Sequence, residues 1–153
     1  MSYKIFVSYS TKDMEIVKEL VRHLQDPSVE VFVAEYSVRP GEKLNATIIK
    51  AIKKCDHFVL LWSKNSKGSE YVSQEIALAL NNDKDILPIV LDEGLHLPGF
   101  INDLKYLPAY KGLNASMQWV ENYLTNVAKK SEREKAWAIL ALVTGAIFLF
   151  GRE

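Results

Sequence analysis

The stretch His57-Phe58-Val59-Leu60-Leu61-Trp62 is an almost entirely apolar run that predicts a strand in a sheet covered on both faces. Similar short runs lie at Lys4–Tyr9, Val29–Val33, Ile86–Leu91 and Leu107–Tyr110. Segments with helical spacing separate them, at Thr11–Gln25, after Glu42, after the Ser63–Ser69 loop and at Ala115–Lys130. This alternation predicts an α/β fold, a flavodoxin-like doubly wound five-stranded parallel sheet.

Composition bounds the function. The 153 residues, 17.4 kDa, suit one domain, and 19 Lys+Arg balance 19 Asp+Glu, which argues against broad binding of nucleic acid. A single cysteine, Cys55, excludes an intramolecular disulfide, and three scattered histidines show no metal-ligand spacing, so no metal site is expected. No signal peptide opens the sequence, which favours an intracellular domain.

A ligand site is expected where the strand order reverses, between the first and third strands. The first strand ends in Ser8-Tyr9-Ser10 and the third in Trp62-Ser63. Serines and aromatics there argue against a phosphoacceptor receiver, which needs carboxylates at these places. The GxxxxGK[ST] and GxGxxG motifs of nucleotide-binding loops are absent from the sequence.

One carboxylate is a candidate for this crevice. On the helix after Ser69, with Val72, Ile76, Ala79 and Leu80 expected inward, Glu75 lies about 60° to one side of Val72. A carboxylate on that flank is either partly desolvated and aimed along the crevice, or a boundary glutamate whose head stays in water. The helical position alone favours the second interpretation.

Four motifs lie in order across about residues 3 to 130: Lys4–Ser10 with Asp13, Arg39-Pro40-Gly41, Ser69–Ile76 and Ile86–Ile89. Together they resemble a TIR (Toll/interleukin-1 receptor) domain of the prokaryotic NAD-cleaving type. The first motif is similar to the family's box 1 and the second to its BB loop. The third resembles its S-x-W-V-x-x-E-I helix segment, and the fourth resembles its fourth strand.

The resemblance implies an NAD+ nucleosidase with Glu75 as the catalytic residue. NAD+ would be the substrate, and no resident cofactor is expected. The products would be nicotinamide and ADP-ribose, or a cyclic or modified ADP-ribose that signals to a downstream effector in antiviral defence. The alternatives are a non-enzymatic TIR interaction or adaptor module and a membrane-targeted toxin.

The resemblance also implies six residues that bind NAD+: Ser8, Tyr9, Ser10, Arg39, Leu44 and Tyr71. Ser8 and Ser10 would approach the ribose and phosphates, or else cap the first helix. Tyr71 would line the nicotinamide side or pack at the helix start. Arg39 would meet phosphate, or be a solvated or assembly charge. Leu44 occupies the position where family members often have an aromatic residue that stacks on the adenine base. The alternative is that Leu44 is a core residue of the first helical turn and does not contact NAD+.

The resemblance further implies self-association through TIR–TIR contacts. Residues 131–153 form a separate predicted unit, a basic linker and the uncharged segment 136–150. As a helix of about 22 Å this segment is shorter than the roughly 30 Å hydrocarbon core. A membrane tail anchor on a cytoplasmic domain, at the inner membrane, is favoured over an oligomer-forming helix and over a helix packed on its own domain.

Overall fold

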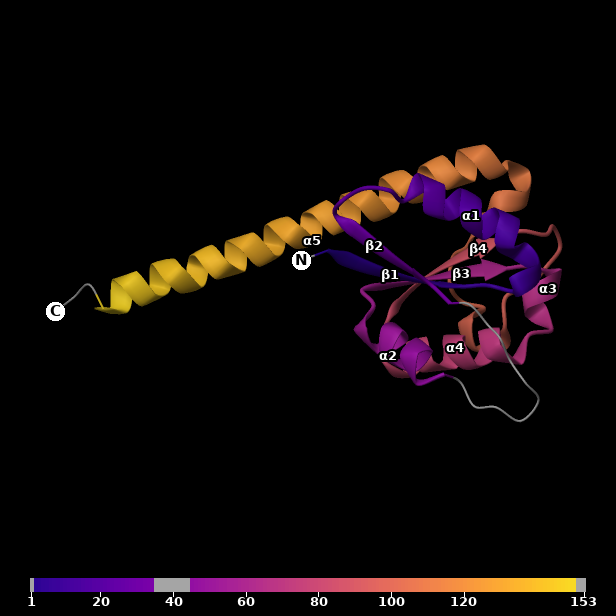
Figure 1. Ribbon diagram of the computed structural model, residues 1–153, viewed down its shortest axis with the longest axis horizontal. Helices are drawn as coiled ribbons and strands as arrows, with labels where there is room; N and C mark the ends of the chain where they lie inside the picture. The colour runs from indigo at the N-terminus through magenta and orange to yellow at the C-terminus, as the bar shows by residue number, and fades with distance from the viewer. Residues whose placement is uncertain (1, 35–44, 151–153) are drawn as a thin grey trace.

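The computed structural model describes residues 2–34 and 45–150, with side chains described as far as residue 145. Its sheet is parallel throughout and has the order β2-β1-β3-β4-β5, which confirms the predicted flavodoxin-like fold (Figure 1). The strands are β1 Tyr3–Ser8, β2 Val29–Val33, β3 His57–Trp62, β4 Asp85–Val90 and β5 Leu107–Pro108. The order reverses between β1 and β3, so these two strands frame the expected site.

Helices connect the strands and cover both faces of the sheet (Figure 1). They are η1 Thr11–Asp13, α1 Met14–His23, α2 Ala46–Lys54, α3 Lys64–Lys67, α4 Glu70–Asn81, η2 Gly99–Ile101, η3 Ala109–Lys111 and α5 Leu113–Phe150. The segment after β3 was expected to be a loop, but it contains the single turn α3. That turn forms because Ser63 and Ser66 make a reciprocal capping box around it.

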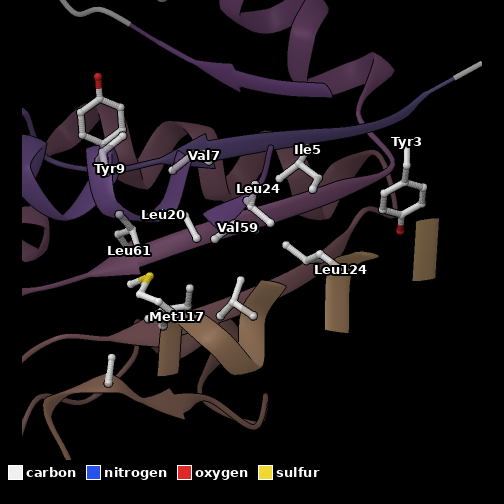
Figure 2. Close-up of a cluster of buried hydrophobic side chains, with 14 of the residues drawn as sticks. Tyr3, Ile5, Val7, Tyr9, Leu20, Leu24, Val59, Leu61, Met117 and Leu124 are labelled. Carbon is white, nitrogen blue, oxygen red and sulfur yellow. The ribbon is translucent and has the colours of Figure 1, made fainter. Parts of the chain in front are cut away.

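The alternation of β1 side chains divides the core into two layers. Ile5, Val7 and Tyr9 pack against α1 and the first turns of α5, a cluster that Figure 2 shows. Phe6 faces the opposite way, toward α2 and α4, and stacks on Phe32 and Phe58 with ring centroids 5.5 Å apart on each side. Because side chains alternate between faces along a strand, Ser8 lies on the same face as Phe6.

The buried stripe of α4 is rotated relative to the prediction. Val72, Ile76 and Ala79 are fully buried as expected, but Leu80 is 37% exposed. Glu75, on the other flank of the stripe, is 0% exposed. Leu80 lies about 80° from Val72 around the helix and Glu75 about 60° in the opposite sense, so the core contact is centred toward Glu75.

Pro88 tolerates its place in β4 because β5 is short. It pairs in register with Leu60 of β3 on one side. On the other side, β5 pairs only with Ile89 and Val90, beyond the proline. The missing N–H of Pro88 therefore falls in a part of β4 that has one neighbouring strand. This agrees with the prediction that Pro88 occupies a weakly paired position.

Helix α5 is continuous from Leu113 to Phe150, so the predicted core helix and the residues after Lys130 form one rod. Its first turns pack on the sheet through Met117, Val120, Leu124 and Ala128. Beyond them the helix extends away from the sheet (Figure 1), and Trp137 and Leu142 are 69% and 74% exposed. Among the described residues, no helix is long and apolar enough to span a bilayer. The division of the chain at residue 130 stays a prediction.

Candidate functional site

The centre of the candidate site is a buried serine–glutamate pair. The Ser8 hydroxyl, at the end of β1, donates a 2.7 Å hydrogen bond to Oε1 of Glu75 on α4. Both residues are 0% exposed. The interpretation of Glu75 as a boundary residue with its head in water is therefore wrong. Burial strengthens the field of a carboxylate, because the surrounding groups screen charge less than water does.

Local structure explains why the pair forms. The strand alternation that buries Phe6 turns Ser8 toward α4, and the cap at Ser69, whose hydroxyl accepts from the Val72 N–H, fixes where α4 begins. Glu75 then follows within two turns of that cap, on the sheet-facing stripe. A carboxylate is consequently held beside the carboxyl end of β1, where the sequence located a ligand site.

Tyr9 and Ser10 have other partners. The Tyr9 ring is buried in the opposite layer, with α1 and α5, and its hydroxyl donates to the backbone carbonyl of Ala34. Ser10 caps η1, with its hydroxyl accepting from the Lys12 N–H at 3.3 Å. The capping alternative thus describes Ser10 and not Ser8, whose hydroxyl binds the Glu75 carboxylate.

Of the remaining predicted contact residues, the structure describes Tyr71. Tyr71 is half-buried in the first turn of α4, one turn before Glu75 and on the same side of the helix. Arg39 and Leu44 lie outside the described residues. Their predicted contacts with NAD+ stay predictions.

The sequence analysis did not single out Asp13 as a site residue. The Asp13 carboxylate accepts from the Ser63 hydroxyl at 2.5 Å and from the Asn65 side-chain amide at 2.8 Å. It thereby joins the end of η1 to the turn after β3, across the point where the strand order reverses. The signal available in the sequence was a carboxylate shortly after β1 matched by a serine-rich segment after β3.

No cluster of three or more His, Cys, Asp or Glu side chains that could hold a metal ion occurs in the described part of the chain. The described site offers two buried carboxylates, those of Glu75 and Asp13, each with a serine hydroxyl as a hydrogen-bond partner.

Comparisons with known proteins agree on the family. A family model described as TIR domain matches residues 5–124. The probable 2' cyclic ADP-D-ribose synthase BdTIR of Brachypodium distachyon is 30% identical over 69% of this chain and 50% of its own length. The probable 2' cyclic ADP-D-ribose synthase TcpO of Methanobrevibacter olleyae is 29% identical over 88% of this chain and 40% of its own. The chain thus spans half or less of the length of these curated relatives.

Solved structures with the same fold include the TIR domain of the Toll-related receptor TRR-2 from Hydra magnipapillata. It is 21% identical, with a TM-score of 0.65 over 84% of this chain and 99% of that one. A prokaryotic SEFIR domain is 22% identical, with a TM-score of 0.57 over 79% of this chain and 97% of that one. At these identities the likeness concerns the fold alone.

Proposed function

Because this chain belongs to the TIR domain family, we propose that it is an NAD+ nucleosidase that breaks the bond between nicotinamide and ribose. The observation that carries the proposal is the Glu75 carboxylate, wholly buried and hydrogen-bonded to Ser8 at the carboxyl end of β1. Two relatives named as probable 2' cyclic ADP-D-ribose synthases support a reaction at that bond.

A single carboxylate is enough for this reaction. The nicotinamide of NAD+ is already a cation, so it leaves with the electron pair of the glycosidic bond and needs no proton from an acid. Positive charge then develops on the ribose. A fixed anion beside the ribose stabilises that oxocarbenium-like state more than the ground state, which lowers the barrier.

The product follows from what attacks the ribosyl cation. Capture by water gives ADP-ribose and releases one proton, and capture by a hydroxyl of the same molecule gives a cyclic ADP-ribose with the same proton release. The names of the relatives favour the cyclic product. We propose that this product signals to a downstream effector in antiviral defence, as the family resemblance implies.

The buried state of Glu75 requires an opening step, because a ribose cannot touch a carboxylate with no exposed surface. We propose that self-association through TIR–TIR contacts provides this step. In the open state Ser8, Ser10 and Tyr71 would line the ribose, phosphate and nicotinamide positions, and Arg39 would meet phosphate.

The test is nicotinamide release from NAD+ by concentrated protein, measured by chromatography with mass identification of the second product. The variant Glu75→Gln keeps the shape and an acceptor oxygen for Ser8 but removes the anion, and it should lower turnover by about 10²-fold or more. The matched control is Glu70→Gln, an exposed glutamate at the start of the same helix, with turnover unchanged. Equal turnover in Glu75→Gln and wild type would refute the role, and no release by concentrated wild-type protein would favour the adaptor alternative.

A further inference from the structure

The strand-order reversal between β1 and β3 is bridged by a second buried carboxylate, that of Asp13. Asp13 closes the turn η1 after β1 and is 8% exposed. Its two oxygens have different partners, Oδ2 accepting from the Ser63 hydroxyl at 2.5 Å and Oδ1 from the Asn65 amide at 2.8 Å. Both distances lie within the range of well-formed hydrogen bonds.

The partner side of this bridge is itself rigidly built. The Ser63 hydroxyl accepts from the backbone N–H groups of Asn65 and Ser66, both at 3.1 Å, so its single proton is directed to Asp13. The Ser66 hydroxyl accepts from the Ser63 N–H at 2.6 Å and completes the capping box. The carboxylate therefore anchors to a structured turn and not to a loose loop.

The β1 side is equally constrained. The Asp13 N–H donates to the Ser10 carbonyl at 2.8 Å, which closes the turn that begins at the end of β1. Within six residues the chain is fixed at three places. Ser8 binds α4 through Glu75, Tyr9 binds the residue after β2 through the Ala34 carbonyl, and Asp13 binds the turn after β3.

We propose that Asp13 is a positioning residue for the candidate active site. Its carboxylate clamps the turn after β1 to the turn after β3 and so sets where Ser8 meets Glu75. The inference rests on the proposed function, because its catalytic consequence is the placement of the Glu75 carboxylate against a ribose. Misplacing a reacting group by about 1 Å can cost about 10²-fold in rate.

The experiment compares Asp13→Ala, Asp13→Asn and the matched control Asp26→Ala in the full chain. Asp26 accepts from the Ser28 hydroxyl at 2.5 Å in the turn before β2, at the opposite end of the sheet from Asp13. The control therefore removes a bond between the same residue types at the same length, away from the site. Asparagine at position 13 keeps an oxygen acceptor for the Ser63 hydroxyl. Its NH2 group can donate to the side-chain oxygen of Asn65 if the Asn65 amide rotates by half a turn.

Turnover of NAD+ is measured with kcat and KM separated. We expect Asp13→Ala to lower kcat about tenfold or more with KM within about threefold, because an interaction that matters in the transition state is lost. Asp13→Asn should recover to within about threefold of wild type, and Asp26→Ala should keep its kcat. Equal kcat in Asp13→Ala and Asp26→Ala, or no recovery in Asp13→Asn, would overturn the proposal. If Asp13→Ala does not fold, Asn65→Ala, which removes one of the two bonds, must still lower kcat.

Amide hydrogen exchange separates this proposal from the proposed function. If wild-type protein does not cleave NAD+, the function fails, but the clamp still predicts faster exchange at residues 8–13 and 63–66 in Asp13→Ala than in Asp26→Ala. Unchanged exchange in those two segments would overturn the clamp itself.

Discussion

Replacing Ser8 by alanine tests whether the buried pair stabilises the fold. The change removes the 2.7 Å donor of the Glu75 carboxylate at a place that water does not reach. A hydrogen bond to a charged group contributes about 1.5–3 kcal/mol to the free energy of unfolding. For a chain of this size, that loss corresponds to a decrease of Tm by about 3–12 °C.

The measurement is urea unfolding followed by tryptophan fluorescence, together with a thermal scan. The matched control is Ser2→Ala, because Ser2 also donates to a glutamate, Glu30, at 3.0 Å but in an exposed place. Solvent replaces that bond, so its loss should change the free energy of unfolding by less than about 0.5 kcal/mol.

A double-mutant cycle assigns the effect to the pair. Because glutamine still accepts from Ser8, the variants Glu75→Gln, Ser8→Ala and their combination give the part of the interaction energy that depends on the charge of Glu75. We expect Ser8→Ala to cost less stability when position 75 is glutamine, since a neutral acceptor gives a weaker bond of about 0.5–1.5 kcal/mol. If Ser8→Ala costs the same stability in both backgrounds, or no more than Ser2→Ala does, the Ser8–Glu75 bond does not stabilise the fold as argued.

Three further outcomes are expected. Burial lowers the pKa of His57, although the nearby carboxylates of Asp85 and Asp56 partly oppose this shift. As the pH falls through 6.5, His57 therefore takes up a proton in the unfolded chain before it does so in the folded chain. The stability that is present above that pH is then lost below it. The free energy of unfolding, measured with urea at a series of pH values, should fall more steeply with decreasing pH for wild type than for His57→Gln. Parallel pH dependences would contradict the role given to His57. Met117→Ala should lower the free energy of unfolding by about 2–5 kcal/mol by opening a cavity under α5, whereas exposed Gln118→Ala should leave it nearly unchanged; a similar small effect in both would argue that α5 docks loosely. Burial raises the pKa of Cys55 to about 11, so a thiol reagent at about pH 8 should label this cysteine quickly only after unfolding. Rapid labelling of the native protein would show instead that the surroundings of Cys55 open to solvent.

The order and type of the main elements follow from local pattern. The runs Val29–Val33 and His57–Trp62 predict strands with the observed bounds. His57–Trp62 is almost wholly apolar because a strand buried on both faces leaves few polar positions. The alternation of strands with helical segments then leaves few right-handed arrangements, and the observed sheet order is one of them. The single turn α3 was missed because two serines that cap each other read like a polar loop.

Spacing along the chain was sufficient to predict the α/β architecture and to identify Glu75 as the candidate carboxylate. Helical spacing put Glu75 on the flank of a stripe and could not say whether that flank is wet or dry. Tertiary packing settles this question, because the packing of β1 against α4 brings the Ser8 hydroxyl to the Glu75 carboxylate, 67 positions away in sequence. The same packing excludes solvent from both side chains. Asp13 meets Ser63 and Asn65 for the same reason, as only the packing of two parallel strands makes residues so distant in sequence hydrogen-bonding neighbours.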